Sequence, residues 1–352
     1  MFMRYLFIFI VFLLASCSHE EPIHNTQSYV FGTLVDITIY GESEEESQAI
    51  SSEIIRQFQE LHNRLHAWRP SEIKKLNHAF ASGKTPVSIH ADVAAIIADA
   101  TTLSIQSKGA FNPAIGGLIS AWGFQSDEFK PIKVNEANIR DLVQANPQMV
   151  DIVVKNGKAF SNNPAVKLDL GGFAKGYALD RALTFLRKSG VKNALINIGG
   201  NIIALGQHGN KAWRVGIQHP RNPNAIAVLD LPSGWAIGTS GDYQRYFELG
   251  GKRYCHIIDP ATGTPVQGIQ AVTVLIPPQI NAGMLSDVSS KPIFIAHPND
   301  RAEAASAMGV DDYLIIESDK KLFASASLAK KLTWLDKEAE KHVTIIQPPT
   351  QP

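Results

Sequence analysis

A series of short apolar segments separated by turn residues is the feature that most constrains the fold. Between residues 194 and 249 the chain reads ALINIG, NIIALG, WRVGIQ, AIAVLDL and YQRYFEL, and RYCHII follows across a Gly250-Gly251 turn. Runs of this length, bounded by turn residues, are typical of strands joined by hairpins. Longer helical segments stand apart from these strands, and the chain shows no repeats. We therefore expect a single large α+β unit with mixed antiparallel sheets and packed helices, not a doubly wound α/β fold.

Periodicity places the other elements. Residues 29–40 alternate apolar and polar side chains, which predicts a strand. Apolar residues recur at helical spacing in the segment that follows, at Ile50, Ile54, Phe58, Leu61 and Leu65. Further helices are expected at 92–107, ended by Lys108-Gly109, at 174–189, ended by Gly190, and over AGMLSDVSS, which Pro292 limits or kinks. AVTVLIPP predicts a strand, and DYLIIES and KLFASASL predict edge or closing strands.

The first residues, MFMRYLFIFIVFLLASCS, have the pattern of an export signal. The apolar run of about eleven residues is too short to span a bilayer, which needs about 20. The order Leu14-Ala15-Ser16-Cys17 resembles the lipobox of bacterial lipoproteins, although an ordinary signal peptide cut nearby is the alternative. We expect a signal peptide at 1–16, lipidated Cys17 with a polar tether at 17–27, a folded unit at 28–335 and a polar tail at 336–352.

Several acyl chains on Cys17 would hold the protein to a membrane, whereas a single chain is marginal. The protein would then be a bacterial lipoprotein that faces the periplasm from the inner or the outer membrane. Ser18 favours the outer membrane if the organism is Gram-negative. With Cys17 used for lipid, only Cys255 remains, which excludes an intramolecular disulfide. The 33 basic residues balance 33 acidic ones, and without a basic field we expect no nucleic-acid partner.

Three glycine-rich stretches are candidate phosphate sites. In LDLGGFAKGYALD, residues 168–180, paired glycines and Lys175 open a helix, where backbone N–H groups and the helix dipole can bind a phosphate. A tight strand-to-helix turn explains the same residues, and they match neither of the common nucleotide-binding motifs. NIGGNIIALG, 197–206, suits a turn or bulge between strands. GTSGDY, 238–243, sets two hydroxyls beside glycine, either to hold a phosphate or to form a turn.

A fourth stretch, YCHIIDPATGTPV at 254–266, places His256 before a turn. His256 is either a catalytic base held by that turn or a core histidine. Rigid turns position functional side chains, and histidine titrates near neutral pH. We expect Asp259 to shape the turn and Cys255 to point to the opposite face of the strand.

Taken together and in this order, these stretches resemble one family. With GTLVDI, HAWRPSEIKKLN, GAFNPAIGGLISAWGF, WRVGIQHP and SDVSS, residues 28–330 look like an ApbE-type FAD:protein FMN transferase. The resemblance implies an enzyme that attacks the FAD pyrophosphate with a threonine hydroxyl of an acceptor subunit of a membrane redox complex. FMN is then attached through a phosphodiester and AMP leaves. The alternatives are an FAD pyrophosphatase that yields FMN and AMP, and a non-catalytic FAD-binding lipoprotein.

The resemblance also assigns residues. His256 matches the proposed catalytic base of the family. Similar proteins usually have methionine at the position of Phe31, tyrosine at that of Trp68, Asp at that of Asn112 and Thr at that of Ala114; large faces are kept at the first two, and a carboxylate is lost at the third. The FAD contacts would come from Phe31, Trp68, Ala110, Phe111, Asn112, Asp169, Lys175 and Ile257.

Similar proteins bind Mg²⁺ through an Asp, a Thr four residues later and a backbone carbonyl of the glycine motif. Asp287 and Gly172 fit this pattern, but Lys291 stands at the Thr position. Two interpretations follow: Ser290 and waters complete a Mg²⁺ site, or the Lys291 ammonium takes over part of the charge neutralisation. An Asp–Lys pair four residues apart is also an ordinary helical ion pair. Of these we favour a retained Mg²⁺ site.

Overall fold

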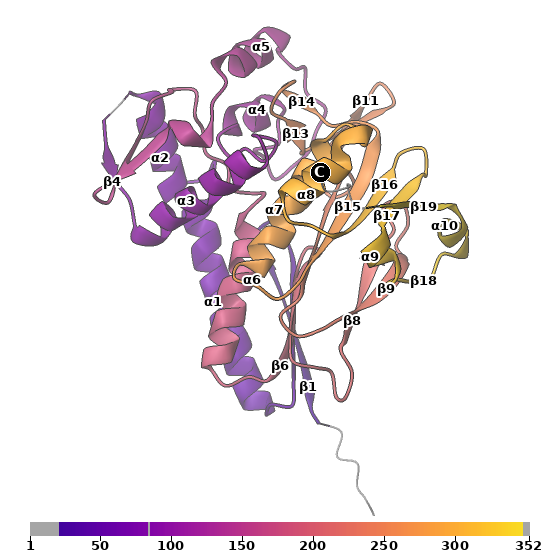
Figure 1. Ribbon diagram of the computed structural model, residues 1–352. Helices are drawn as coiled ribbons and strands as arrows, with labels where there is room; N and C mark the ends of the chain where they lie inside the picture. The colour runs from indigo at the N-terminus through magenta and orange to yellow at the C-terminus, as the bar shows by residue number, and fades with distance from the viewer. Residues whose placement is uncertain (1–20, 84, 348–352) are drawn as a thin grey trace, which may run out of the picture.

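A large antiparallel sheet forms the centre of the protein, whose computed structural model describes residues 21–83 and 85–347. All neighbouring strands in it run antiparallel except the last pair, β17 and β19. The sheet confirms the α+β expectation (Figure 1). Its strands, in spatial order, are β1 Ile23–Val30, β2 Thr33–Tyr40, β6 Asn193–Ile198, β7 Asn201–Leu205, β10 Ala236–Gly241, β15 Ile269–Ile276, β16 Asp312–Glu317, β17 Leu322–Ser325 and β19 Val343–Ile346.

Smaller sheets and the helices complete the fold. The helices are α1 Glu44–Leu65, α2 Glu72–Ala81, α3 Ala91–Gln106, α4 Gly116–Ala121, α5 Glu136–Ala145, α6 Ala174–Lys188, α7 Ala282–Ile295, α8 Arg301–Ala307, α9 Ala326–Ala329 and α10 Lys337–His342. The smaller sheets are β18 Thr333–Trp334 with β9 Ala225–Leu231 and β8 Trp213–Gln218, β3 Val87–Ser88 with β5 Lys158–Ser161 and β4 Ile152–Lys155, and the hairpins β11 Tyr246–Leu249 with β12 Lys252–Cys255 and β13 Ile258–Asp259 with β14 Thr264–Pro265. In the described part of the chain, none of the helices combines the length and apolar character needed to cross a membrane.

Two hydrophobic cores cover the two faces of the central sheet. Helices α1, α6 and α7 bury their apolar faces on one side, where Phe58, Phe173 and Phe294 lie in one cluster with Val272 of β15. The β8–β9–β18 sheet packs on the other side, against residues such as Leu275 of the same strand. Because β15 is covered on both faces, all eight of its residues are buried, which explains its continuous apolar sequence.

The first strand prediction needs a correction. Residues 29–40 are not one strand: β1 and β2 form a hairpin, and its turn is Phe31-Gly32. Both turn residues have positive φ, 58° at Phe31 and 72° at Gly32. Such a turn reverses the chain within two residues, and alternation of side chains alone does not reveal it. The hairpin begins at Ile23, so the last residues assigned to the polar tether belong to the sheet.

The C-terminal prediction also needs a correction. Residues 337–346 are not a tail: they form α10 and β19, and β19 pairs in parallel with β17. This makes β17 an internal strand, and β16 is internal between β15 and β17, whereas we expected both segments to be edge or closing strands. The polar composition of the segment hid Ala339, which is buried against the second core. Residues 1–20, including the predicted signal peptide and Cys17, and residues 348–352 lie outside the described residues.

The predicted helices are present, and α7 is longer than expected. It runs through Pro292 to Ile295. Proline removes one helical hydrogen bond, but Ile293 and Phe294 are fully buried directly after it. Burial of this end of the helix therefore outweighs the missing N–H.

Helices α6 and α7 approach each other at two glycines. A Cβ at Gly176 would lie 2.4 Å from the Gly283 carbonyl oxygen, and one at Gly283 would lie 2.8 Å from the Gly176 carbonyl oxygen. The Asp180 carboxylate of α6 accepts hydrogen bonds from the backbone N–H groups of Gly283 and Met284, at 2.8 and 2.7 Å. It therefore caps the first turn of α7 from the neighbouring helix, and burial raises its pKa to about 6.

We predict that Gly176→Ala destabilises the protein by about 1–3 kcal/mol, because its methyl group would overlap the α7 main chain. Gly117→Ala is the matched control, since its Cβ would meet only the flexible end of Leu142. The control should change stability by less than about 1 kcal/mol. Urea unfolding measures both, and equal midpoints for the two variants would contradict the close helix contact.

Candidate functional site

A cavity of about 790 Å³ opens beside the N-terminus of α6, the first hairpin turn and the loops around α4. Its wall includes the predicted base, every predicted FAD contact and most of the predicted metal set. Segments far apart in the sequence thus meet at one place. The predicted residues in this wall are Phe31, Trp68, Ala110, Phe111, Asn112, Asp169, Gly172, Lys175, His256, Ile257, Asp287 and Lys291.

The glycine motif 168–180 forms the strand-to-helix turn that we considered, and it lines the cavity. Asp169 is buried, and its carboxylate accepts hydrogen bonds from the Gly171 N–H at 3.0 Å and the Gln125 amide at 3.0 Å. Lys175, in the first turn of α6, reaches back so that its ammonium lies 3.4 Å from the Gly171 carbonyl. The N-terminus of α6 and the charge of Lys175 therefore face the same cavity, as a phosphate site requires.

The His256 ring is fixed by the main chain of Arg245. The Arg245 carbonyl accepts the His256 backbone N–H at 3.1 Å, and Nδ1 of the ring lies 3.2 Å from the same oxygen. A carbonyl oxygen can only accept, so a neutral ring carries its proton on Nδ1 and keeps a free lone pair on Nε2. Cys255 points the other way, into the core, as the strand alternation predicted.

The pKa of His256 is lowered to about 3, first by burial and then by the nearby Arg245, Lys175 and Lys291 cations. The imidazole is therefore neutral at pH 7 and able to accept a proton. The turn after it is rigid: Asp259 accepts the Ala261 N–H at 2.9 Å, and the Trp122 indole donates to the Gly263 carbonyl at 2.7 Å. These contacts confirm that Asp259 shapes the turn.

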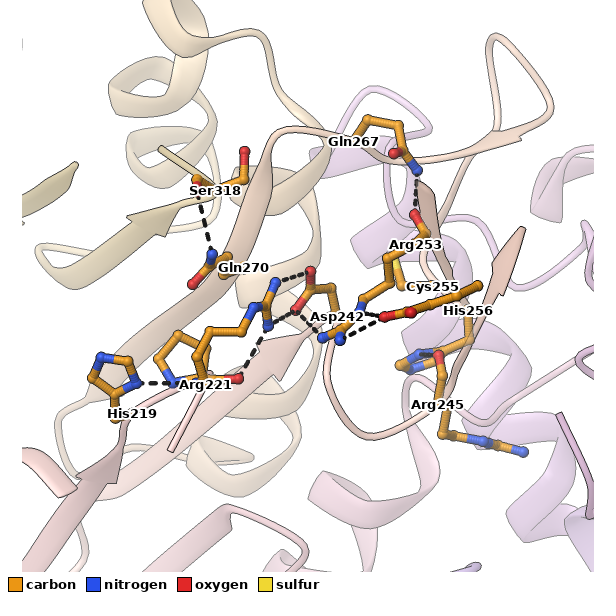
Figure 2. A network of polar contacts seen from close by, with 12 residues as sticks. His219, Arg221, Asp242, Arg245, Arg253, Cys255, His256, Gln267, Gln270 and Ser318 are labelled. Atoms are coloured by element: carbon orange, nitrogen blue, oxygen red, sulfur yellow. Dashed lines mark hydrogen bonds and ion pairs between the residues drawn. The ribbon is translucent and has the colours of Figure 1, made fainter. Parts of the chain in front are cut away.

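Behind His256, a charged network fixes the chain after β10 (Figure 2). Asp242 of the GTSGDY stretch accepts two hydrogen bonds from the Arg221 guanidinium, at 2.7 and 2.6 Å, and lies 3.9 Å from Arg253 of β12. The bidentate geometry holds the Asp242 turn firmly. Because Arg253 lies three residues before His256, the network joins both segments that position the imidazole.

The hydroxyls of GTSGDY are used inside the protein. The Thr239 and Thr273 hydroxyls lie 2.9 Å apart, and those of Ser240 and Ser290 lie 2.7 Å apart. Thr239 and Ser240 belong to β10, so this part of the stretch is strand and the turn follows it. Of the two sequence interpretations, the hydrogen bonds favour the structural one.

Aromatic and imidazole rings form another wall. Phe31 lies 5.9 Å from Phe58 and 5.6 Å from His62, and the row continues through His66 to Trp68, with centroid distances of 5.0 and 4.3 Å. Burial lowers the pKa of both histidines. The sequence analysis missed this pair: His62 lies in the last turn of α1, and His66 follows the end of that helix directly.

Arg245 is another cavity residue that sequence reasoning missed. Its guanidinium lies 6.0 Å from the Trp68 ring centroid and 5.2 Å from that of Phe129. Figure 2 shows this group pointing away from the Asp242 network. Burial lowers its pKa from the ordinary value of 12.5, but a guanidinium stays charged at pH 7. Its position in the sequence, between the GTSGDY stretch and His256, could have indicated that it belongs to the site.

The loop before α4 differs from the expectation at Asn112. Phe111 and Asn112 are buried, and both ends of the Asn112 amide bind main chain. The amide nitrogen donates to the Pro147 carbonyl at 2.9 Å, and the amide oxygen accepts the Ala114 N–H at 3.0 Å. The oxygen of this side chain is thus used in holding the loop, and the amide shows no free acceptor of the kind that a carboxylate would offer to FAD.

The residues expected to hold Mg²⁺ do not fit a magnesium ion. Asp287 Oδ1 lies 2.8 Å from the Lys291 ammonium, and Oδ2 accepts the Gly176 N–H at 3.0 Å. The Ser290 hydroxyl donates to the Asp287 carbonyl, 3.0 Å away, besides its contact with Ser240. Mg²⁺ requires near-octahedral oxygen ligands, and these acceptors are already engaged. Among the described residues, no three His, Cys, Asp or Glu side chains gather closely enough to hold a metal ion.

The fold and the cavity define a class of α+β proteins in which cations, aromatic rings and histidines of lowered pKa surround a cleft. The sequence profile of the ApbE family matches residues 31–314, so the chain belongs to this family. It is similar to the FAD:protein FMN transferase of Rhodobacter capsulatus, with 35% identity over 91% of this chain, and it spans 60% of that relative's length. One from Klebsiella pneumoniae (strain 342) is 32% identical over 73% of this chain and 78% of its own length.

Solved structures agree with the family assignment. The ApbE protein of Thermotoga maritima superposes with a TM-score of 0.78 and 26% identity, over 88% of this chain and 99% of that one. The flavin transferase ApbE of Vibrio cholerae shares the fold, with a TM-score of 0.75, 24% identity and the same coverage. The predicted family and fold are thus confirmed, whereas the roles of individual side chains stay predictions.

We predict that Asn112→Asp destabilises the protein by about 1–3 kcal/mol at neutral pH, because a carboxylate would face the Pro147 carbonyl without a donor. Asn299→Asp, at an exposed position, should have little effect. Thermal unfolding at two pH values measures the difference. The loss should shrink at acid pH, where a protonated carboxyl can donate; a pH-independent loss would contradict the explanation.

Proposed function

We propose that this protein is an FAD:protein FMN transferase. The observation that carries the proposal is the neutral His256, whose Nε2 lone pair is free in the same cavity as Lys175, Lys291 and Arg245. Cations suit a pyrophosphate, and a neutral imidazole suits a hydroxyl that must lose its proton. Membership of the ApbE family and the names of the relatives support the same activity.

The reaction exchanges one phosphate ester for another. The threonine oxygen attacks the phosphorus of the FMN half of FAD, and the bond from that phosphorus to the bridging oxygen breaks. AMP leaves with the bridging oxygen, and His256 Nε2 takes the hydroxyl proton. Phe31 and Trp68 offer faces for the flat rings of FAD, while Lys175 and Arg245 offset the phosphate charge. No step is routed through Mg²⁺, because the residues that the resemblance assigns to it do not fit that ion.

The cellular setting is a further part of the proposal. The lipobox-like Leu14-Ala15-Ser16-Cys17 supports a bacterial lipoprotein that faces the periplasm from the inner or outer membrane. Threonine-bearing subunits of membrane redox complexes are then the expected acceptors. Both points rest on the sequence and the resemblance alone.

We predict that His256→Ala retains FAD binding within about threefold and lowers FMN transfer by about 10²–10⁴-fold, the usual contribution of a general base. Fluorescence quenching measures binding, and intact mass of a threonine-containing acceptor measures transfer. His297→Ala, exposed at the start of a short helical turn, is the control. Transfer at the wild-type rate by the His256 variant would exclude this residue as the base.

The same assay separates the alternatives for the wild-type protein. Gain of one FMN by the acceptor supports transfer, and free FMN with AMP supports pyrophosphate hydrolysis. Unchanged FAD supports a flavin-binding protein without catalysis.

We predict that kcat/KM for transfer changes less than about twofold between pH 7.5 and pH 5.5, because the free enzyme keeps His256 neutral down to about pH 3. A histidine with the ordinary pKa of 6.5 would lose about tenfold over the same range. The sign follows from the lowered pKa: the base is active above it and is lost only below it. An inflection near pH 6.5 that is absent from the FAD-binding profile would contradict the assignment.

A further inference from the structure

Lys291 lies between Asp287 and Gly172, the two residues that the family resemblance assigns as ligands of a metal ion. Its ammonium lies 2.8 Å from Asp287 Oδ1 and 2.5 Å from the Asp287 carbonyl oxygen. Its side-chain stem lies against Gly172, where a Cβ would be only 2.6 Å from Lys291 Cε. The side chain is 15% exposed, so protein encloses most of it. The ammonium is therefore held in one position and does not extend freely into solvent.

Gly172 makes this placement possible. Any side chain there would displace the lysine stem, so the glycine leaves the groove in which the stem lies. Lys291 projects from α7, and the glycine belongs to the motif that opens α6. The close packing of these two helices through Gly176 and Gly283 brings the lysine to the glycine motif. The lysine position is thus part of the fold.

The charges also oppose a second cation. Lys175 approaches the same Asp287 oxygen to 3.7 Å, so one carboxylate already faces two ammonium groups. A divalent ion on this carboxylate would lie within about 4 Å of an ammonium group, where like charges repel strongly in a partly buried site. It would also have to displace the two Lys291 contacts and find oxygen ligands to replace them.

We propose that the Lys291 ammonium replaces the divalent cation of the site, so that this protein neutralises the FAD pyrophosphate with Lys291, Lys175 and Arg245 and transfers FMN without added metal. This proposal rests on the proposed function. Unlike a bound ion, a covalently attached ammonium is not lost by chelation or dilution. The cavity borders all three cations and His256, so the charge lies where the pyrophosphate would bind.

The test compares the wild-type protein with Lys291→Thr and Lys291→Met, each in EDTA and after addition of MgCl₂. Wild-type transfer should differ less than twofold between the two conditions. Lys291→Thr should lose about 100-fold in EDTA, similar to the loss of one charge-stabilising donor, and should regain activity with MgCl₂. Lys291→Met keeps the stem without the charge and should stay inactive in both. Lys75→Thr, at an exposed site on α2, is the matched control.

FAD affinity gives a second measurement that needs no transfer. The wild-type Kd for FAD should not depend on MgCl₂, whereas Lys291→Thr should bind FAD more tightly as MgCl₂ is added. Wild-type transfer or FAD binding that collapses in EDTA and returns with MgCl₂ would overturn the proposal. Metal-independent FAD binding without transfer, in contrast, would leave the charge replacement standing and contradict the proposed transferase activity.

Discussion

Helices α6 and α7 touch through their main chains at Gly176 and Gly283, and the site depends on this contact. Asp180 crosses from α6 to cap α7, and Asp287 crosses from α7 to accept the Gly176 N–H. These reciprocal bonds satisfy polar groups that would otherwise be buried without partners. They also fix the distance between α6 and α7, so that Lys291 of α7 reaches Gly172 in the glycine motif before α6. The positions of Lys291 and of the glycine motif in the cavity wall therefore follow from this helix packing.

The cavity combines charges that would not be stable together elsewhere. Three cations surround a histidine, and burial with their repulsion keeps that histidine neutral. Asp287 has its pKa lowered to about 2 by the two lysines despite its burial, so it remains a carboxylate between them. The net result is positive charge without a proton on the base. A pyrophosphate satisfies the cations, and the same cations keep the histidine able to accept a proton.

Local sequence patterns predicted helices α1, α3, α6 and α7 and many of the strands, because apolar period and glycine stops depend on neighbouring residues alone. They did not predict the remaining helices or the central strand β10. The Phe31-Gly32 turn was not predicted, because a two-residue turn within an alternating segment leaves the alternation of side chains unchanged. The structure of residues 337–346 was not predicted, because the pairing of β19 with β17 is a long-range interaction that the polar local sequence does not indicate. The predicted cavity residues came from the family resemblance, which did not supply Arg245, His62 of α1 or His66 directly after that helix. Only packing shows that the Asn112 amide is fully engaged by main chain and that Lys291 lies against Gly172.

The first hairpin links the start of the described chain to the cavity wall. The eight residues of β1 lead from the entry of the chain to Phe31 in the cavity wall. At about 3.4 Å per residue, this strand carries the cavity up to about 25 Å beyond that entry. Under the proposed anchor at Cys17, the length of β1 would contribute to the distance between the anchor and His256. The strand length would then be one factor in which acceptor loops reach the cavity.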